Sequence, residues 1–289
     1  MTNVLEIDPI THEKFYKAGT DMLFKSVFSD EKNRDLLENI IEVTVGKKVK
    51  IIKSPLMQEI IKTNISTKKK TLDVLVEDKN GIQYNIEINM SNYLELPRRN
   101  ASFIFSKYAE DIKQHETYDK MHTFIQINLT SGLSKDYPEA CKYQLIDKES
   151  GRKYIDNLTI YEYNLDKLEE ICYNEKKNKY KILAALICGK KELHEICKGD
   201  KLLEKLESEV IRMNSNRKFV GLMSQEEEAE KLQNTLINGA RREGITEGIE
   251  QGVKQNKLEI AKNMLNENMD IEIISKVTGL TKEEIKTLK

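Results

Sequence analysis

The sequence lacks several features that would define its class at once. It contains no tryptophan, only 4 prolines and only 4 cysteines among 289 residues. No apolar run approaches the roughly 18 to 20 residues that a membrane-spanning helix needs, so we expect no membrane partner. The first residues, MTNVLEIDPITHEKF, carry acids and a proline where a secretory signal has an apolar run. We therefore expect a cytoplasmic protein whose cysteines are free thiols.

The chain also lacks an excess of charge of either sign. Lysine and arginine number 47 and aspartate and glutamate number 48, so the formal net charge is -1. This balance argues against indiscriminate binding of nucleic acid, which needs a basic surface. It does not exclude a nuclease, because DNA contacts can come from local basic patches. Charged residues make up 33% and hydrophobic residues 39% of the chain, a composition typical of a helix-rich protein with a core.

The spacing of apolar residues indicates both helices and strands. Helical periodicity occurs within 20–45 and 96–118, and again in several pieces from about 166 to 214. Alternation of apolar and polar residues predicts strands at 123–129, 142–147 and 157–165. After about Met223 the composition changes, and a long, highly charged helix is predicted. We therefore expect two parts, 1–222 and 223–289.

The second part carries two distinctive patterns. Gly244, Gly248 and Gly252 recur at four-residue spacing, which indicates a closely approaching partner helix or a flexible joint, because each glycine costs about 1 kcal/mol in a helix interior. Two short helices follow, and Thr281 and Glu284 match a capping box at the start of the second. They look like part of a helix-turn-helix that could bind DNA. We favour a helical docking module and a homo-oligomer formed through the C-terminal helix.

The stretch TLDVLVEDKNGIQYNIEINMSN, residues 71–92, predicts a β-hairpin. A three-residue loop with Gly81 in the left-handed conformation pairs Asp78 with Ile82 and places Asp73 directly opposite Glu87. This register puts the apolar side chains on one face and polar side chains on the other, whereas a slip by one residue would mix them. Opposed carboxylates repel one another. They are tolerable on a solvated outer face, or if a divalent cation lies between them, and both alternatives stay open.

Four segments, in order, carry a family resemblance: TDMLFKSVF, LDVLVEDKNGIQYNIEIN, LPRRNASFIFSKYAEDIKQHETY and TFIQINL. With them the chain resembles the PD-(D/E)XK nuclease superfamily, specifically the bacterial recombination-promoting nuclease and putative transposase group. The C-terminal segment also looks like tails attached to such proteins. The resemblance implies an α/β fold of α+β type, in which a restriction-endonuclease-like core has a mixed sheet, flanking helices and a helical C-terminal tail.

The resemblance also implies an active site on the hairpin. Asp73 corresponds to the metal-binding aspartate of the family and Glu87 to the first acid of its E-x-K element. Asn89 occupies the lysine position, which this group often fills with glutamine. Asp21 corresponds to an acid on the first helix that can join the metal site, and the alternative is an ordinary acid at a helix N-terminus. Tyr108 falls on the helix after the hairpin, where the family places residues near the site, and it is equally compatible with a place in the core.

The implied reaction is hydrolysis of a DNA phosphodiester assisted by Mg²⁺ or Mn²⁺ held by Asp73 and Glu87. Because Asn89 supplies no charge, nearby cations could compensate and contact DNA, or they could be solvated surface groups: Lys70, Arg98, Arg99 and Lys107. We expect a metal-dependent endonuclease associated with recombination or mobile elements. The alternative is a catalytically weakened or inactive protein of the same fold that binds DNA or another protein.

Overall fold

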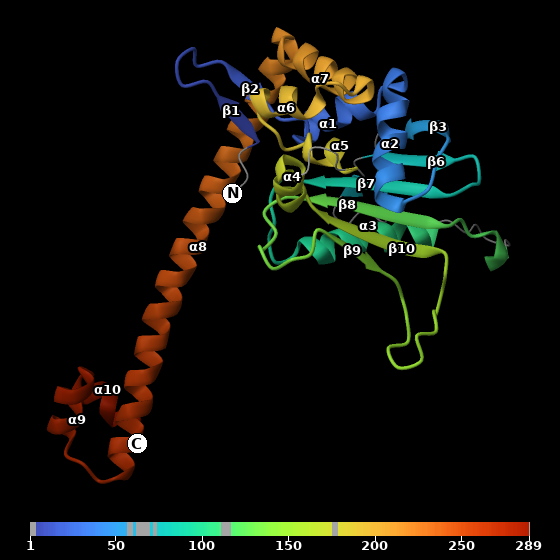
Figure 1. The fold of residues 1–289 in the computed structure, drawn as a ribbon. Helices are drawn as coiled ribbons and strands as arrows, with labels where there is room; N and C mark the ends of the chain where they lie inside the picture. Colours follow the sequence, from blue (N-terminus) through green and yellow to red (C-terminus); the bar gives the residue numbers. More distant parts are fainter. Residues whose placement is uncertain are drawn as a thin grey trace. The chain divides into compact units, whose positions relative to one another are not determined.

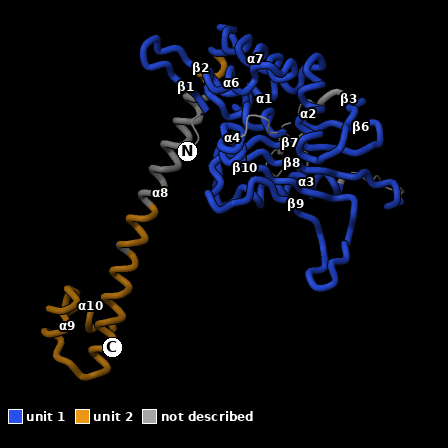
Figure 2. Tube along the Cα trace, in the orientation of Figure 1, with its two compact units in different colours: residues 1–220 blue, residues 221–289 orange. Residues whose placement is uncertain are grey.

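The computed structural model describes residues 4–56, 60–61, 70–71, 74–110, 117–174 and 179–288. Within these ranges only the backbone is described at 53–56, 60–61, 70–71, 110, 226–240, 242–243 and 250. The chain forms two compact units, Met1–Val220 and Gly221–Lys289 (Figure 2). Each unit is described by itself.

The first unit is built around a six-stranded mixed sheet with the strand order β3-β6-β7-β8-β10-β9 (Figure 1). Its strands are β3 (Ile51–Leu56), β6 (Val74–Asp78), β7 (Gln83–Asn89), β8 (Phe124–Thr130), β9 (Ala140–Tyr143) and β10 (Leu158–Asn164). β8 pairs in parallel with both β7 and β10, and the other pairs are antiparallel. The predicted mixed sheet is thus confirmed, although β9 ends at Tyr143 rather than continuing to 147.

One face of the sheet packs on apolar helices. α1 (Asp21–Phe28) buries two phenylalanines four residues apart, Phe24 and Phe28, with ring centroids 4.5 Å from each other. α2 (Arg34–Val45) buries its leucine and isoleucine stripe and ends at Gly46, whose φ of 77° suits a left-handed cap. The Tyr163 hydroxyl on β10 donates to the carbonyl of Thr44 on α2 at 2.6 Å, which attaches this layer to the sheet.

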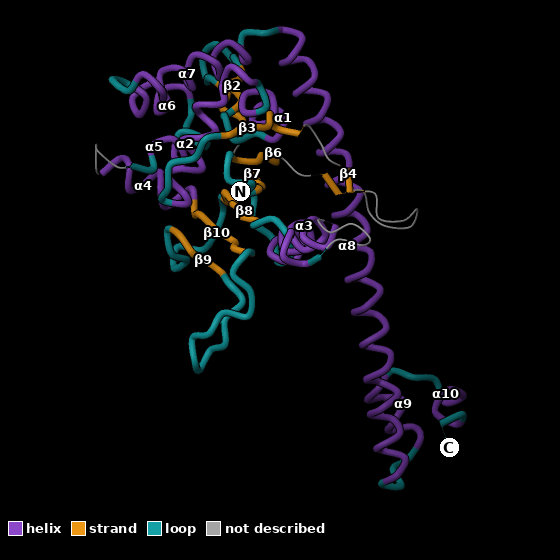
Figure 3. The backbone as a smooth tube through the Cα atoms, turned by 90° about the vertical axis from the view of Figure 1, so that its right-hand side faces the viewer, coloured by secondary structure: helices purple, strands orange, loops and turns teal. Residues whose placement is uncertain are grey.

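The opposite face is covered by α3 (Leu96–Glu110), as Figure 3 shows. Phe103 of α3 packs against Leu75 of β6. The next residue, Ile104, packs with Phe124 and Leu158 of the sheet. α3 therefore crosses the sheet on the face that carries the polar residues of the hairpin.

The remaining elements of this unit lie outside the six-stranded sheet. They are β1 (Leu5–Ile7), β2 (Lys14–Tyr16), the 3₁₀ turns η1 (Glu31–Asn33) and η2 (Tyr118–Lys120), β4 (Ile60–Ile61), β5 (Lys70–Thr71), α4 (Leu165–Asn174), α5 (Lys181–Ala184), α6 (Lys190–Cys197) and α7 (Lys201–Asn214). β1 pairs with β2, and β4 pairs with β5. Asn214 at the end of α7 accepts from the Tyr16 N–H at 2.7 Å and donates to its carbonyl at 3.0 Å. This pair of bonds joins β2 to α7.

The predicted hairpin register is confirmed. Leu75 faces Asn85 and Glu77 faces Gln83, and Gly81 has a left-handed φ of 76°. Asp73 lies outside the described residues, so its predicted pairing with Glu87 stays a prediction.

Asp78 fixes the turn of this hairpin. Its Oδ1 accepts from the N–H groups of Asn80 at 2.8 Å and Ile82 at 3.0 Å. The Tyr84 hydroxyl donates to Oδ2 at 3.3 Å. Although Asp78 is 2% exposed, both carboxylate oxygens are therefore satisfied, as burial of a charged group requires.

The second unit is helical. α8 (Arg217–Asn266) begins just before the boundary between the units, and α9 (Ile271–Thr278) and α10 (Lys282–Lys286) follow it. A small core packs the end of α8 against the two short helices through Ala261, Ile274, Leu280 and Ile285. The predicted capping box between Thr281 and Glu284 is present. Among the described residues, no helix is both long enough and apolar enough to cross a membrane.

Replacing Asp78 with alanine removes the acceptor of two turn N–H groups and should lower the free energy of unfolding of the first unit by about 1–3 kcal/mol. All 12 tyrosines precede the second unit, so urea denaturation followed by tyrosine fluorescence measures the first unit alone. Lys79→Ala, at an exposed position of the same turn, is the control and should change stability by less than about 0.5 kcal/mol. Equal stability of Asp78→Ala and the wild type would contradict this role.

Candidate active site

Three polar side chains on one face of β7 are buried. Asn85, Glu87 and Asn89 alternate with apolar residues and therefore point to the same side of the sheet. Asn85 and Asn89 are each 5% exposed, and Glu87 is fully buried. The alternative of a solvated outer face is therefore wrong for this strand, because α3 covers it.

α3 contacts this face with a cation at one end and apolar groups at the other. Arg99 donates from Nη1 to Asn89 Oδ1 at 3.4 Å, and its guanidinium lies 5.1 Å from the centre of the Phe103 ring. Phe103 in turn packs on Leu75. Asn100 comes between these contacts along the helix and is 2% exposed. Within the described part of the chain, neither amide atom of Asn100 has a hydrogen-bond partner.

A chain of side-chain hydrogen bonds runs from Glu87 across β8 to β10. Asn85 Nδ2 donates to Glu87 Oε1 at 2.9 Å and to Gln126 Oε1 at 2.8 Å. Gln126 Nε2 donates to Asn128 Oδ1 at 2.8 Å. Asn128 Nδ2 then donates to Glu162 Oε2 at 3.0 Å. Two carboxylates are thus connected by three amides.

A second chain of hydrogen bonds reaches the same glutamate from α3. Beyond the Arg99 contact, Asn89 Nδ2 donates to Thr130 Oγ1 at 3.4 Å. The Thr130 hydroxyl donates to Glu162 Oε1 at 2.5 Å. We call the eight residues of the two chains the polar network: Asn85, Glu87, Asn89, Arg99, Gln126, Asn128, Thr130 and Glu162.

The strand register brings the polar network together. In the parallel pair β7–β8, Asn85 lies beside Gln126, Glu87 beside Asn128 and Asn89 beside Thr130. In the parallel pair β8–β10, Asn128 lies beside Glu162. Side chains of laterally paired residues point to the same face, so three strands contribute polar groups to one surface.

Five members of the polar network were not predicted as site residues: Asn85, Gln126, Asn128, Thr130 and Glu162. The alternation in FIQINLT was used only to predict a strand. Its polar positions were a usable signal, because a half-buried strand rarely carries three polar residues on a covered face. Glu162 had no such signal, since its place depends on the pairing of β10 with β8.

Burial raises the pKa of Glu162, and the hydrogen bonds from Thr130 and Asn128 act in the opposite direction. Both neighbouring groups are donors to the carboxylate, and hydrogen bonds to the charged form favour it. The Glu162 carboxylate is 9% exposed, so loss of hydration is the larger effect.

The other predicted site residues are not all gathered on this face. Asp21 begins α1, and its carboxylate is about half exposed and pairs with Lys25 Nζ at 2.8 Å. Arg98 is exposed and Lys107 is half-buried on α3. Asp73 and the side chain of Lys70 lie outside what the structure describes. Tyr108 belongs to the core, where its hydroxyl donates to Asn157 at 3.0 Å and its ring lies edge-on to Phe124.

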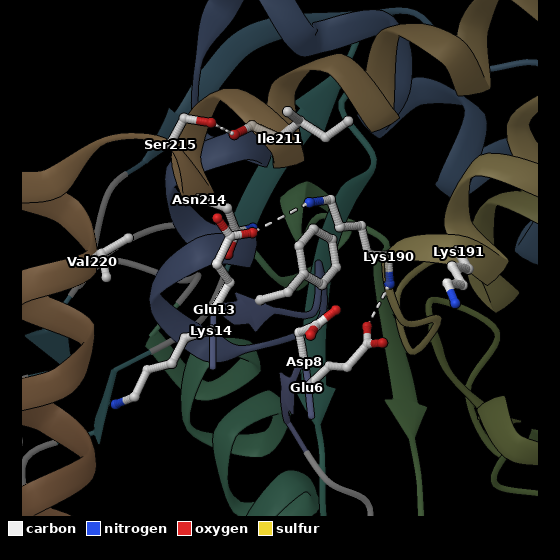
Figure 4. A pocket seen from close by; sticks show the side chains of 11 residues that line it. Glu6, Asp8, Glu13, Lys14, Lys190, Lys191, Ile211, Asn214, Ser215 and Val220 are labelled. Carbon is white, nitrogen blue, oxygen red and sulfur yellow. Dashed lines mark hydrogen bonds and ion pairs between the residues drawn. The ribbon is translucent and has the colours of Figure 1, made fainter. Parts of the chain in front are cut away.

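A surface pocket near the β1–β2 hairpin, α6 and α7 contains none of these residues (Figure 4). Charged groups at its rim engage one another. The backbone N–H of Lys190 donates to Glu6 at 2.7 Å, and its ammonium lies 3.9 Å from Glu13. We therefore place the candidate site at the polar network and not in this pocket.

The oxygen atoms on the covered face suit a hard divalent cation. Glu87 supplies a carboxylate, and within the described residues Asn85 Oδ1 is buried without a hydrogen-bond partner. Carboxylate and amide oxygens are the ligands that Mg²⁺ and Mn²⁺ prefer. Among the described residues, on this face as elsewhere, no three histidine, cysteine, aspartate or glutamate residues form a group that could hold a metal ion. A metal centre on this face would therefore need Asp73 or amide oxygens beside Glu87.

Comparison with protein families identifies the fold that carries this site. The model of the PD-(D/E)XK nuclease family transposases matches residues 18–240, which include the sheet, α3 and the whole polar network. The chain belongs to this family. PD-(D/E)XK nucleases generally use a divalent metal ion, and the predicted family and α/β fold are confirmed.

The C-terminal segment is matched separately. The C-terminal HTH domain of the Rpn/YhgA-like nuclease family matches residues 254–289, which contain the end of α8, α9 and α10. This match supports the helix-turn-helix reading over the docking module that we favoured from the sequence. Comparisons with curated proteins and with solved structures gave no match.

Replacing Glu162 with glutamine should change how stability depends on pH. Because folding raises the Glu162 pKa, the folded state retains this proton to higher pH than the unfolded state, and the free energy of unfolding falls as pH rises through the raised pKa. Glutamine has no such dependence. Urea denaturation should therefore show the wild type losing stability relative to Glu162→Gln from the ordinary carboxyl range upward. If the difference in the free energy of unfolding between the two proteins does not vary with pH, the raised pKa of Glu162 is contradicted.

Proposed function

We propose that this protein is a divalent-metal-dependent DNA endonuclease associated with recombination or mobile elements. Family membership supports the reaction class. The observation that carries the proposal is a fully buried glutamate, Glu87, on the hairpin of the matched region, held by a hydrogen bond from Asn85. Carboxylate oxygens are the ligands that hard divalent cations prefer, and Glu87 stands where the family resemblance expects a metal ligand.

In the proposed site, Asp73 and Glu87 would hold Mg²⁺ or Mn²⁺, and Asp21, the predicted third acid, would have to leave its ion pair with Lys25 to join them. When bound, the ion polarises the phosphate and activates the attacking water. Asn85 orients the Glu87 carboxylate by donating to Oε1 at 2.9 Å. Because its amide nitrogen is engaged there and at Gln126, its oxygen is directed away from both and is available to an ion or a water.

Arg99 is proposed to supply the positive charge that Asn89 lacks. Asn89 is neutral, but its amide oxygen accepts from the Arg99 guanidinium at 3.4 Å. A guanidinium keeps its charge at every physiological pH and binds phosphate oxygens in a forked geometry. Held beside the covered face, Arg99 would stabilise the charge that develops on the phosphate during hydrolysis. Asn89 would then act by holding Arg99.

DNA is the proposed partner of both units. Beside Arg99, the candidate contacts of the first unit are Lys70, Arg98 and Lys107. In the second unit, the helix-turn-helix match suggests DNA binding. Lys286 on α10 is exposed, and Lys282 pairs with Glu272 at 2.6 Å. The positions of the two units relative to each other are not needed for this proposal.

A homo-oligomer is proposed to form through α8. Ile245, Ile249 and Val253 are each at least half exposed and recur every four residues. Gly244, Gly248 and Gly252 precede them, and a Cβ built on any of these glycines would meet no neighbouring atom. A second copy of the helix could approach closely along this stripe and cover the apolar side chains.

The wild type should nick supercoiled plasmid in the presence of Mg²⁺ or Mn²⁺, and Glu87→Ala should be inactive. Arg99→Ala should lower the nicking rate about 100-fold or more, as loss of a donor to the transition state does. Arg152→Ala, at an exposed arginine between β9 and β10 that belongs to no part of the proposed site, is the matched control and should retain most of the activity. If the wild type and Glu87→Ala are equally inactive with both ions, the enzyme is excluded, and the catalytically inactive DNA- or protein-binding alternative remains.

Truncation before Ser224 should leave the first unit folded and change the oligomeric state, because it removes the exposed stripe of α8. Light scattering coupled to size exclusion measures the mass of the full chain and of the truncated protein. The subunit number should fall on truncation. Replacing Ile249 with lysine in the full chain should have the same effect without shortening it. An unchanged subunit number in both proteins would exclude this interface.

A further inference from the structure

Glu162 is the end point of both hydrogen-bond chains of the polar network. It lies on β10, separated from β7 by the whole of β8. One of its oxygens accepts from Asn128 at 3.0 Å, and the other accepts from Thr130 at 2.5 Å. No feature of the proposed reaction requires a carboxylate at this distance from the hairpin. Its role must therefore be sought in what it does to the groups between it and β7.

An ionised carboxylate can only accept hydrogen bonds, whereas a primary amide donates at one end and accepts at the other. Glu162 therefore turns the Asn128 amide nitrogen toward itself, which leaves Asn128 Oδ1 facing Gln126. Gln126 must donate to that oxygen and present its own oxygen to the next strand. Each amide thus fixes the orientation of the one beside it.

The last amide of this chain is Asn85. Because Gln126 presents an oxygen, Asn85 must point its amide nitrogen between β7 and β8, and the same nitrogen donates to Glu87. If the hydrogen bonds of this chain ran in the opposite direction, Asn85 would present its amide oxygen to the Glu87 carboxylate. Two buried acceptors would then face each other. The direction set at Glu162 therefore decides whether Asn85 donates to Glu87 or opposes it.

Glu162 fixes the direction of the second chain of hydrogen bonds in the same way. The Thr130 hydroxyl has one hydrogen, which it gives to Glu162. Its oxygen can then only accept, so it takes the amide nitrogen of Asn89. Asn89 consequently turns its oxygen toward Arg99. The same carboxylate fixes the contact that holds the cation.

We infer that Glu162 is a positioning residue that sets the direction of the side-chain amides of the polar network, so that Asn85 donates to Glu87 and Asn89 accepts from Arg99. The inference rests on the proposed function only where it treats Glu87 as a metal ligand. A purely structural glutamate would stabilise the sheet. A positioning glutamate also changes the state of Asn85, which it does not touch.

The test is the NMR signal of the Asn85 side-chain amide in the ¹⁵N-labelled full-length protein, assigned by its loss in Asn85→Ala. Glu162→Gln preserves shape but adds a donor, and should shift this signal across the intervening strand. Thr130→Val interrupts only the second chain and should leave the signal in place. Cys141→Ala is the packing control, because Cys141 lies beside Glu162 on β9.

Asn128→Leu gives an independent arm that keeps Glu162 itself. It removes one amide from the first chain, so it should shift the Asn85 signal as Glu162→Gln does. An Asn85 signal that is unmoved in a folded Glu162→Gln or Asn128→Leu protein would overturn the inference. So would an equal shift in Cys141→Ala, since packing and not hydrogen-bond direction would then be the cause.

A measurement of Mn²⁺ affinity connects this role to the proposed site. Mn²⁺ is added without DNA, and the electron paramagnetic resonance signal of the unbound ion reports how much is free. Loss of a group that orients a metal ligand typically weakens metal affinity by about 10-fold to 100-fold. Glu162→Gln should weaken Mn²⁺ binding by an amount in this range. Glu170→Gln removes the same charge from an exposed position on α4 and should bind as the wild type does. Wild-type affinity in Glu162→Gln would overturn the inference. A wild type that binds no Mn²⁺ would overturn the proposed function alone, because the NMR comparison needs no metal.

Discussion

Burial of Glu87 under α3 is the constraint on which the rest of this site depends. Moving a carboxylate out of water costs several kcal/mol even after the protein relaxes, and Glu87 is fully buried. The sheet compensates part of this cost with the Asn85 hydrogen bond. Asn85 needs an acceptor for its second hydrogen, and Gln126 needs one in turn. A single buried carboxylate thus requires polar residues on neighbouring strands.

α3 makes this arrangement possible because it contacts the sheet with apolar side chains and with one charged side chain. Phe103 and Ile104 pack on apolar residues of the sheet and hold the helix in place. Arg99 lies four residues before Phe103 and reaches the end of β7 with its charged group. Apolar packing therefore positions a cation beside a polar surface that would otherwise be open to water. The same packing excludes solvent from Glu87, which strengthens every electrostatic interaction there.

Under the proposed function, both units would contact DNA, and only the first would carry the chemistry. The first unit contains the polar network, and the second contains the segment matched as a helix-turn-helix. Each has its own apolar core, and in the second, among the residues whose side chains are described, a cluster of four buried residues is surrounded by partly buried apolar side chains. A near-neutral net charge is consistent with such a division, because local groups on each unit, and not a basic surface over the whole chain, would contact the phosphates.

Local chemistry made the hairpin predictable. Asp78 and Gly81 suit only certain turn positions, and the alternating apolar residues tolerate one register, so 71–92 contained enough information to pair Leu75 with Asn85. The long helix after the first unit and the Thr281 capping box were predictable for the same reason, since both depend on residues close in sequence. The family was indicated by segments in a fixed order, which needs no knowledge of distances.

Burial and connection of the site were decided by tertiary structure alone. Whether the polar face of β7 meets water or a helix depends on where α3 packs, and of the two alternatives left open, the solvated outer face is wrong for Glu87. The bonds that build the polar network join residues 41 and 34 positions apart. They exist because β7, β8 and β10 lie side by side in parallel. The sequence determined which side chains can accept or donate a hydrogen bond, and the order of the strands determined which of them meet.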